Sequence, residues 1–493
     1  MSTTDRKHAG RRLVAAAAFA LCVGLGVMTA STYGSSYTFP SAVPKAKCGP
    51  GARPETSIQG RVPSADFASN RVLRGYMCNT RQVSQFGKTG GFKAQRYTDS
   101  RGNTCAYYDS TALIGKDILA QLGGPGLGVI VLDMNDPAHP RQTAKLTSLA
   151  MLSPHESVLL NQRRGLLAAV LSTPATNLGI VDIYDVKTDC QHPKRLSSTP
   201  TGLLGHESGW APDGKTFWTA SSSASIAAVD VSNPSRPKRI FQQFGVVYHG
   251  LRFSGDGRTM YVANIGTPTF TRFSNGGLRI IDVSQVQDRK PNPKVTILSD
   301  LGWREGSIPQ AAEPFTRNGH RYVLEVDEYA NFKPTAALDV NQVDAPVGAA
   351  RIINVDDSRN PYVVSNIRLQ VHQPANRAGE QKTDPGAIVP VQGYTAHYCS
   401  VPYRDNPKLV ACSMNLSGLR VFDIRDLRHP KEAAYFNRPI QPLANPLNPI
   451  AIAGYAMSQN TWDVKGRSIW YTDVNSGFYV VKLTNGVGRL LDR

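Results

Sequence analysis

Short apolar runs that each end on a polar residue recur along this chain. Each run has the length and the β-branched residues of a strand that is buried on both faces. The polar residues that end the runs are Asp133, Asp185, Asp230, Asp282, Asn354, Asp423 and Lys482. The first six are each followed, seven to eleven positions later, by a proline: Pro140, Pro193, Pro237, Pro293, Pro361 and Pro430. The spacing of 45 to 72 residues between successive runs fits one four-stranded unit with loops of variable length.

The polar residue at the end of each run predicts a turn. Its side chain can accept hydrogen bonds from the backbone N–H groups of the residues that follow. The proline suits the entry of an outer strand, where a missing N–H costs little. Between the runs, Asp213-Gly214 and Asp256-Gly257 mark tight hairpin turns. Each unit therefore predicts a strand, a turn, a second strand, the anchored strand and an outer strand.

Seven such units predict an all-β fold, a seven-bladed β-propeller, with six or eight blades as alternatives. No strand follows the last run, 477–483, and residues 91–97 and 105–108 could supply the missing inner strands of its blade. Sharing one blade between the N- and C-terminal strands would remove the open sheet edges. We expect the propeller over 71–490, a Pro/Ser-rich linker over 31–70 and a surface insertion at about 357–393.

The repeated runs resemble the LVIVD-repeat family of β-propellers, as in LRIIDVS at 278–284 and LRVFDIR at 419–425. The resemblance covers about residues 125–485. The stretch DGRTMYVAN at 256–264 is similar to the related YVTN-type propellers. The resemblance implies a propeller, and it implies little about activity, because many members are cell-surface or exported proteins of undefined activity.

The N-terminus has the composition of an export signal. Four basic residues, Arg6, Lys7, Arg11 and Arg12, precede an uncharged stretch at 13–30. We expect residues 1–30 to be a cleaved signal peptide, and an uncleaved membrane anchor is the alternative because eighteen residues can just span a bilayer. The protein is then secreted or held at the outer face of the cytoplasmic membrane.

Export makes disulfides the expected state of the cysteines. Beyond Cys22 the chain has six of them, Cys48, Cys78, Cys105, Cys190, Cys399 and Cys412. An even count without a C-x-x-C pair favours disulfides over a zinc site. Cys399 and Cys412 lie in consecutive apolar runs joined by a turn-like segment, so a hairpin would pair them. Cys78 with Cys105 is the second expected pair, and Cys48 and Cys190 have no assigned partner.

The net charge suggests an anionic partner. The chain carries 55 basic and 37 acidic residues, a net charge of +18. Removal of residues 1–30 takes away four basic residues and Asp5 and leaves +15. Outside the membrane this excess favours anionic lipid headgroups or other acidic cell-envelope components, and another envelope protein is the alternative partner. Nucleic acid is not expected as a partner, because the basic residues are dispersed and no recognition motif is present.

Residues with metal-binding side chains recur just before or within the first strand of most units. They are His155, His206, His249, Glu305 and His397, with Ser458 in the seventh unit. The chain reaches the innermost strand of a blade at this point, so these side chains would converge on the propeller axis. The four histidines could bind a transition metal, and Glu156 and Glu207 could accept hydrogen bonds from the rings and orient them. Histidines that only support their own blades, and an axial site for a small ligand, are the alternatives.

Other candidate chemistry is sparse. Glu325, Asp327 and Glu328 follow an apolar run, and we expect them to form a solvated strand end. No nucleophile elbow, H-E-x-x-H helix or phosphate loop is present. The sequence therefore favours an exported binding or scaffolding platform for a small ligand or an anionic envelope partner. The alternative is a metal-dependent oxidoreductase or hydrolase with a histidine-lined site at the axis.

Overall fold

The fold is seen in a computed structural model of the chain. It describes residues 38–110, 128–172, 179–221, 225–268, 273–274, 276–305, 308–328, 347–377, 381, 384, 393–440 and 454–493. Thr38–Arg493 form one compact unit, and the expected signal peptide at 1–30 lies outside the described residues. Within the described part, no helix is long and apolar enough to cross a membrane.

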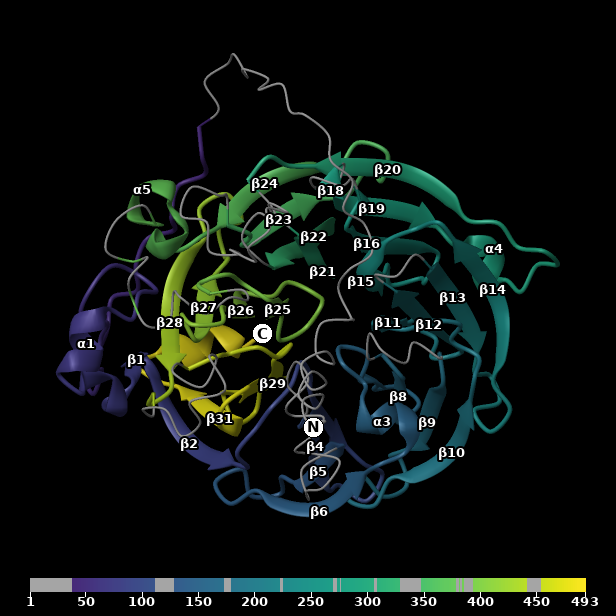
Figure 1. The fold of residues 1–493 in the computed structure, drawn as a ribbon, viewed down its shortest axis with the longest axis horizontal. Coiled ribbons are helices and arrows are strands. Elements are labelled where there is room, and N and C mark those ends of the chain that lie inside the picture. The colour runs from purple at the N-terminus through teal and green to yellow at the C-terminus, as the bar shows by residue number, and fades with distance from the viewer. Residues whose placement is uncertain are drawn as a thin grey trace, which may run out of the picture. The chain divides into compact units, whose positions relative to one another are not determined.

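The described residues form a seven-bladed β-propeller, in which seven sheets follow one another around an axis (Figure 1). The strands are given from the inside outward. Blade 1 is β3 (Ala94–Thr98), β4 (Thr104–Asp109), β5 (Val129–Asp133) and β6 (Arg141–Leu146). Blade 2 is β7 (Leu159–Asn161), β8 (Leu166–Val170), β9 (Val181–Asp185) and β10 (Lys194–Thr199). Blade 3 is β11 (Glu207–Trp210), β12 (Thr216–Ser221), β13 (Ser225–Asp230) and β14 (Lys238–Phe244).

The remaining blades follow the same order. Blade 4 is β15 (Tyr248–Phe253), β16 (Thr259–Asn264), β19 (Gly277–Asp282) and β20 (Thr296–Gly302), with the small hairpin β17 (Thr267–Pro268) and β18 (Phe273–Ser274) inserted. Blade 5 is β21 (Ile308–Arg317), β22 (His320–Glu328), β23 (Ala350–Asn354) and β24 (Tyr362–Ile367). Blade 6 is β25 (Tyr398–Ser400), β26 (Leu409–Ser413), β27 (Leu419–Asp423), β28 (Lys431–Asn437) and β1 (Tyr76–Cys78). Blade 7 is β29 (Thr461–Asp463), β30 (Ser468–Asp473), β31 (Gly477–Leu483) and β2 (Thr80–Phe86).

The helices are short and lie between strands or at the ends of the described unit. They are α1 (Ser64–Ala68), η1 (Arg71–Arg74), α3 (Leu149–Leu152), α4 (Ser284–Gln287), η2 (Gln370–His372), α5 (Pro374–Arg377) and η5 (Val487–Leu491).

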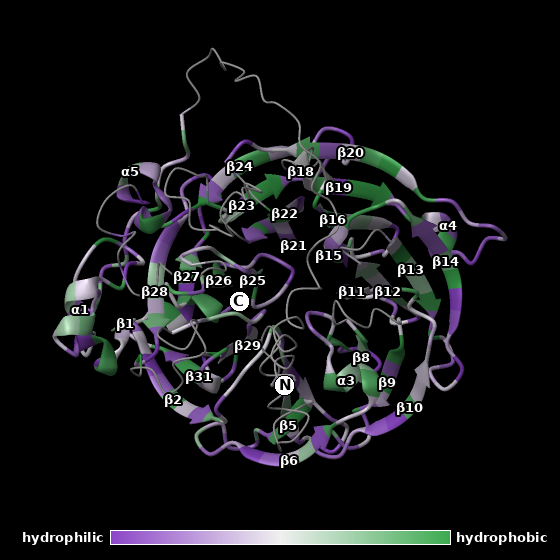
Figure 2. Ribbon diagram, in the orientation of Figure 1, coloured by the Kyte–Doolittle hydropathy of each residue, from purple (hydrophilic) through white to green (hydrophobic). Residues whose placement is uncertain are grey.

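The blades are held together by a hydrophobic cluster at each of the seven interfaces between neighbours. Successive side chains of a strand point to opposite faces of its sheet. In β4, Cys105 and Tyr107 therefore pack toward blade 2, while Ala106 and Tyr108 pack toward blade 7. This is why the repeated runs are apolar at nearly every position. Figure 2 shows the contrast between the largely apolar β5, β9 and β13 and the more polar outer strands β10 and β14.

The polar residue that ends each run forms the predicted turn. In six blades its side-chain oxygen accepts a hydrogen bond from the backbone N–H two residues later, at 2.8 to 3.1 Å. The following proline directly precedes the outer strand in five blades and stands three residues before β20 in blade 4. The seventh anchor, Lys482, instead lies within β31 opposite Arg81. The order of strands and turns within a blade is therefore as predicted.

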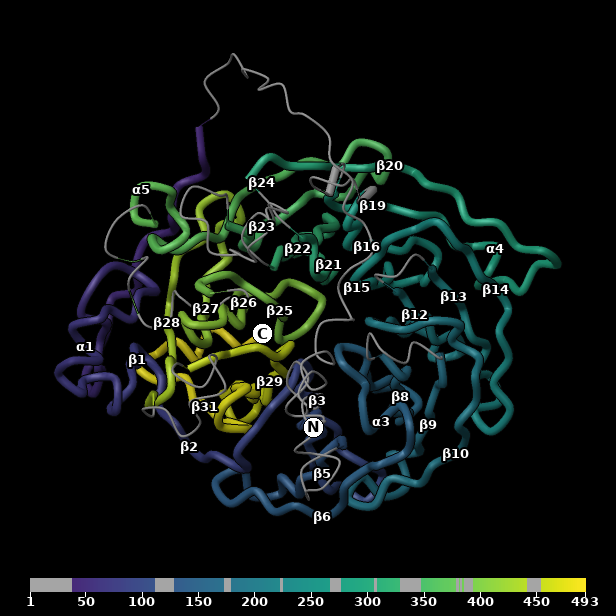
Figure 3. Tube along the Cα trace, in the orientation of Figure 1, coloured from purple at the N-terminus to yellow at the C-terminus, as the bar shows by residue number. Residues whose placement is uncertain are grey.

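The ring closes by sharing blade 7 between the two termini, as predicted, but the strand that closes it is a different one. The N-terminal strand β2 forms the outer strand of blade 7 and pairs antiparallel with β31, from Thr80 opposite Leu483 to Phe86 opposite Phe478. Figure 3 shows the N-terminal β2 beside the C-terminal β31. The expected donors, 91–97 and 105–108, mostly belong to β3 and β4, the two inner strands of blade 1. That expectation was wrong because the last run is a third strand, preceded by its own inner strands β29 and β30.

Residues 38–75, most of which we expected to be a linker, pack against blade 6. Glu55 contacts the buried Arg420, whose Nη1 is 2.9 Å from Glu432 Oε1. Val62 and Val72 pack with Tyr435 of β28 in a separate apolar cluster. The described part of the expected insertion at 357–393 contains β24, η2 and α5.

The three disulfides are Cys48–Cys78, Cys105–Cys190 and Cys399–Cys412. The last pair is as predicted, because Cys399 and Cys412 lie opposite each other in the β25–β26 hairpin. The predicted Cys78–Cys105 pair is wrong. Cys78 belongs to the outer edge of blade 6 and Cys105 to blade 1, with blade 7 between them.

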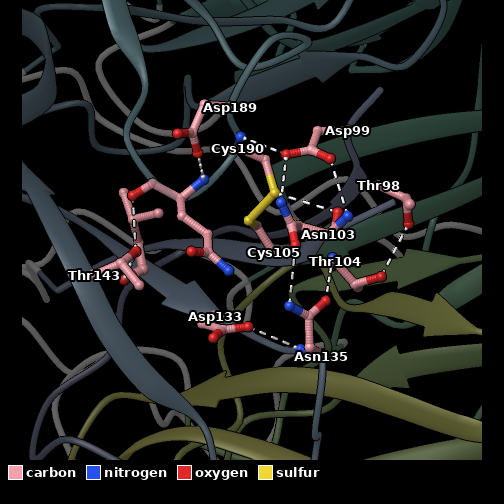
Figure 4. Close-up of a disulfide and its surroundings, with 12 residues drawn as sticks. Thr98, Asp99, Asn103, Thr104, Cys105, Asp133, Asn135, Thr143, Asp189 and Cys190 are labelled. Carbon is pink, nitrogen blue, oxygen red and sulfur yellow. Dashed lines mark hydrogen bonds between the residues drawn. A yellow bond between two sulfur atoms is a disulfide. The ribbon is translucent and has the colours of Figure 1, made fainter. Parts of the chain in front are cut away.

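The Cys105–Cys190 bridge joins blade 1 to the turn between β9 and β10 of blade 2 (Figure 4). Asp99 Oδ2 accepts a hydrogen bond from the Cys190 N–H at 3.1 Å, and Asp99 Oδ1 accepts one from the Asn103 N–H at 2.9 Å. The bridge and this carboxylate together fix the edge between the two blades. Three disulfides indicate an oxidising, extracellular environment.

Loss of the inter-blade bridge should weaken the fold without changing the other two pairs. The bridge closes a segment of 85 residues, so replacement of Cys105 and Cys190 by alanine should lower the free energy of unfolding by about 2–4 kcal/mol. Urea unfolding of the variant and the wild type measures this. Non-reducing peptide mapping of the wild type should recover Cys105 with Cys190, and a Cys78–Cys105 peptide would contradict the assignment.

Candidate metal centre at the propeller axis

Six ionisable side chains from five blades meet at one point. We call them the histidine cluster: His155, Glu156, His206, His249, Glu328 and His397. His155 and Glu156 precede β7 of blade 2, and His249 lies in β15 of blade 4. His206 and His397 extend the inner strands of blades 3 and 6 by one residue, since their N–H groups bond to Ala220 and Ser413. Glu328 ends β22 of blade 5. Side chains of five blades can meet only where the inner strands surround the axis.

Backbone carbonyl groups fix the orientation of two of the rings. His249 Nδ1 lies 3.0 Å from the carbonyl oxygen of Gln310, and His397 Nδ1 lies 2.7 Å from that of Met457. A carbonyl oxygen can only accept, so each Nδ1 carries the proton and donates it. In the neutral ring, Nε2 of His249 and of His397 then presents a lone pair to the cluster. Metal-binding histidines have this same arrangement.

The first group of facing atoms is His206 Nε2, His249 Nε2 and Glu156 Oε2. The two ring nitrogens are 2.9 Å apart, and Glu156 Oε2 lies 3.1 Å from His249 Nε2 and 3.5 Å from His206 Nε2. Glu156 Oε2 is buried and accepts no hydrogen bond within the described residues. Two donors about 2.1 Å from a metal ion and at right angles to each other are about 3 Å apart. The three atoms have the spacing of ligands on one face of a metal ion.

The second group is His397 Nε2, Glu156 Oε1 and Glu328 Oε2. His397 Nε2 lies 3.2 Å from Glu156 Oε1 and 3.5 Å from Glu328 Oε2. The three ligand atoms all lie within 4.8 Å of one another. Gln310 Nε2 donates to Glu156 Oε1 at 2.9 Å and lies 3.3 Å from His397 Nε2.

His155 adds a fourth imidazole beside the first group. Its ring centroid is 4.4 Å from that of His206 and 4.4 Å from that of Phe92. The backbone of His155 has a φ of 49°, a left-handed conformation that is uncommon for a residue with a side chain. The loop before β7 thus directs His155 and Glu156 into the same cluster.

Burial and the two carboxylates shift the pKa values of the imidazoles in different directions. Burial lowers the pKa of His249 to about 3 and the pKa of His155 well below its usual value. Burial also acts to lower the pKa of His397, but hydrogen bonds with Glu156 and Glu328 outweigh it and raise that pKa to about 9. Burial acts to raise the pKa of Glu156, and the surrounding imidazoles outweigh it and hold this pKa well below its usual value. Glu156 is therefore an anion at the centre of the cluster.

Three of the predicted site residues lie elsewhere. Glu305 is buried with its carboxylate 3.8 Å from Arg351 Nη2, among Glu325 and Asp327. Glu207 Oε1 is 2.8 Å from Lys93 Nζ and contacts no imidazole in the described part of the chain. Ser458 Oγ accepts a hydrogen bond from the Thr472 N–H, between strands of blade 7. Glu156, expected behind the rings, instead lies between them.

Sequence reasoning missed Glu328 and Gln310. The expectation of a solvated strand end at Glu325, Asp327 and Glu328 was wrong, because all three are buried. Glu328 lies opposite Ile308, the first residue of β21. Blade 5 thus supplies its acid from the end of its second strand, which lies beside the start of its first. The cluster of acids directly after the apolar run 322–324 was a signal for this position.

A second polar layer joins the blades next to the histidine cluster. We call it the lysine layer: Lys93, Glu207, Arg252 and Gln459. Lys93 Nζ is fully buried and also lies 3.9 Å from the ring centroid of Tyr398, the residue after His397. Arg252 Nη1 is 3.7 Å from Glu207 Oε1, and Arg252 Nη2 donates to Gln459 Oε1 at 2.9 Å. Ion pairs and hydrogen bonds of these side chains thereby cross-link blades 1, 3, 4 and 7.

Comparison with known proteins supports the fold and no narrower class. No family model and no curated protein sequence matches the chain. Among solved structures, it is similar to Kuenenia stuttgartiensis hydrazine synthase, with a TM-score of 0.52, 12% identity and coverage of 82% of this chain and 97% of that one. It is also similar to the β-propeller domain of Myceliophteria thermophila Cps50 (Swd1), with a TM-score of 0.48, 11% identity and coverage of 81% and 99%. The resemblance to the LVIVD-repeat family stays a prediction.

Loss of the carboxylate in the lysine layer should destabilise the propeller. In Glu207→Gln, the buried Lys93 would lose the carboxylate that lies 2.8 Å from its Nζ, and Arg252 would keep Glu313 as its carboxylate partner. We expect the free energy of unfolding to fall by about 3–5 kcal/mol. Urea unfolding checks this, with Asp288→Asn as the matched control, since the Arg258–Asp288 pair is exposed. Equal unfolding midpoints for the two variants would show that Glu207 does not hold the layer together.

Proposed function

We propose that this protein is an extracellular β-propeller that binds a divalent transition-metal ion at its axis. The ligands are His206, His249 and Glu156, with His155 beside them. Imidazole and carboxylate together suit iron, copper, nickel or zinc. The sequence predicted a binding platform for a ligand that it did not identify, and the proposal identifies that ligand as a metal ion. The histidine-lined metal site was part of the alternative, enzymatic hypothesis.

The observation that carries the proposal is the set of facing acceptor atoms around His249 Nε2. Because Nδ1 donates to the Gln310 carbonyl, the neutral ring has its lone pair directed at Glu156 Oε2, 3.1 Å away. Two buried acceptors at this distance repel each other unless a cation lies between them. A proton on His206 Nε2 can form a hydrogen bond with only one of these two acceptors. A metal ion can bind His206 Nε2, His249 Nε2 and Glu156 Oε2 at once.

The surroundings of the site favour a permanent rather than an incidental ligand. Glu156, His249 and His397 are buried, and each of the two rings has its own backbone acceptor. Orientation of the ligand rings before binding lowers the entropy cost of forming the site. By contrast, the exposed His429 contacts the neighbouring Asp426 in a turn.

The metal content of the protein tests the proposal. Protein purified without added metal, or depleted with a chelator and then dialysed against Co²⁺, should contain at least one ion per chain. Glu156→Gln and His249→Ala should each lower the affinity for Co²⁺ by more than about 100-fold, because loss of an outer hydrogen bond alone costs 10- to 100-fold. Elemental analysis and the visible absorption of Co²⁺ report the binding.

The matched control is His429→Ala, which removes an exposed imidazole and should leave the metal content unchanged. Circular dichroism should show that Glu156→Gln, which keeps the shape of the side chain, retains the β-propeller. A wild-type protein that binds no ion after reconstitution would refute the proposal, as would equal affinities in the wild type and both site variants.

One observation favours a second function, a metal-dependent oxidoreductase or hydrolase. Two imidazoles and one carboxylate are the ligand set of many catalytic zinc and non-haem iron sites, which keep coordination positions for a substrate or water. A bound ion of this kind would activate water or polarise a bound oxygen atom. The Gln310 carbonyl would orient the His249 ring, and burial of the site would exclude bulk water.

Binding of a small anion distinguishes this function from storage of a fully coordinated ion. Azide added to the Co²⁺ protein should change its visible absorption in a saturable way, since azide takes an open position on the ion. His139→Ala removes an exposed imidazole and is the control, which should give the same titration as the wild type. A spectrum that azide does not change would leave metal binding intact and contradict the enzymatic function.

The remaining expectations concern location and partners. Export through residues 1–30, attachment to the outer face of the membrane, and attraction to anionic envelope components stay predictions from the sequence. The net charge of +18 supports the last of these.

A further inference from the structure

We propose that the histidine cluster holds a second metal ion, bound by His397, Glu328 and Oε1 of Glu156, so that Glu156 bridges two ions. This inference rests on the proposed function, because the same class of divalent transition-metal ion would occupy both positions. It adds a second binding position and makes Glu156 a bridging ligand, and the first group of ligands requires neither.

The two oxygens of Glu156 face different partners. Oε2 faces His249 at 3.1 Å and His206 at 3.5 Å, whereas Oε1 faces His397 at 3.2 Å. A carboxylate that bound a single ion would need imidazoles beside one of its oxygens only. Opposite orientation of its two oxygens toward two imidazole groups is the geometry of a bridging ligand.

Glu328 also spans both groups. Its Oε2 lies 3.5 Å from His397 Nε2, and its Oε1 lies 3.8 Å from His249 Nε2. Glu156 and Glu328 bring two carboxylates into a buried space, and burial of two like charges is costly unless cations, either a protonated imidazole or metal ions, lie beside them. One ion bound by the first group would lie beside Glu156 Oε2. A second ion would lie beside Glu156 Oε1 and Glu328 Oε2, and each ion would then contact one ring with a fixed Nδ1 proton, His249 or His397.

The second group has its own fixed ring and its own unpartnered acceptor. His397 Nδ1 donates to the Met457 carbonyl at 2.7 Å, so that Nε2 of the neutral ring is available to an ion. Gln310 Oε1 is buried without a hydrogen-bond partner among the described residues, while its Nε2 occupies the space between Glu156 and His397. Rotation of the amide by 180° exchanges these two atoms. The oxygen would then face the second position as a further ligand.

A proton on His397 Nε2 is the competing occupant of this position. It would satisfy Glu156 Oε1 and Glu328 Oε2 without any second ion. Two ions bridged by a carboxylate would give the site the chemistry of two-metal enzymes, in which both attacking and leaving oxygen atoms are held. The number of ions per chain separates these two occupants.

The experiment counts ions in the full chain after removal of metal with a chelator, dialysis against Co²⁺ and a wash to remove weakly bound ions. We expect two ions per chain in the wild type and one in both Glu328→Gln and His397→Gln. Glu313→Gln is the matched control and should keep two, because Glu313 contacts Arg252 and Arg404 instead of the cluster. His139→Ala and His429→Ala remove exposed imidazoles and should also keep two.

A spectroscopic measurement on the wild type removes the dependence on folded variants. With Cu²⁺ in place of Co²⁺, magnetic coupling across Glu156 should reduce the electron paramagnetic resonance signal per ion. Loading with one equivalent of Cu²⁺ should give the full signal of an isolated ion. A full signal from each of two bound ions would contradict the bridge.

The outcomes also separate this inference from the proposed function. One ion per chain in the wild type, unaffected by Glu328→Gln and His397→Gln, would overturn the second position and leave the first. A second ion that disappears in His139→Ala or His429→Ala would show surface binding and would also overturn it. No ion in the wild type would refute both proposals.

Discussion

Pairing of β2 with β31 is the interaction on which the rest of the structure depends. A row of sheets leaves an apolar face at each end, and only a closed ring buries every face. The seven hydrophobic clusters include one between blade 7 and blade 1, which exists only because the ring is closed. Because β2 is the outer strand of blade 7, its backbone hydrogen bonds to β31 hold the ring closed.

Closure also brings polar side chains together that no single blade could hold. The inner strands approach the axis, so whatever side chains they carry there must share a small buried space. Charged groups in such a space require partners of opposite charge. The lysine layer meets this requirement with Glu207 between Lys93 and Arg252. The histidine cluster meets it less completely, because lone pairs of His249 and Glu156 face each other across 3.1 Å.

The contrast between these two neighbouring layers supports the proposal that the histidine cluster is a binding site. In the lysine layer, the cations of Lys93 and Arg252 face the carboxylate of Glu207 and the amide oxygen of Gln459, and the result is a cross-link between blades. In the histidine cluster, backbone carbonyls hold two rings so that acceptors converge. An arrangement that gathers acceptors at an energetic cost is typical of a binding site, where the ligand supplies the missing charge.

The sequence by itself determined what is local to one repeat. The repeated runs and the polar residues that end them predicted seven blades and the turns after the third strand. The turn-like segment between two runs predicted the Cys399–Cys412 pair. Each of these features depends on residues close together in the chain. The histidine positions predicted convergence on the axis for the same reason, as each lies shortly before or near the start of an inner strand. Only the tertiary structure decided which strand closed the ring, which cysteine paired with Cys105, and which acids joined the imidazoles. Those choices depend on contacts between blades and on the direction of each side chain at the axis, and the spacing of residues within a repeat contains no information about either.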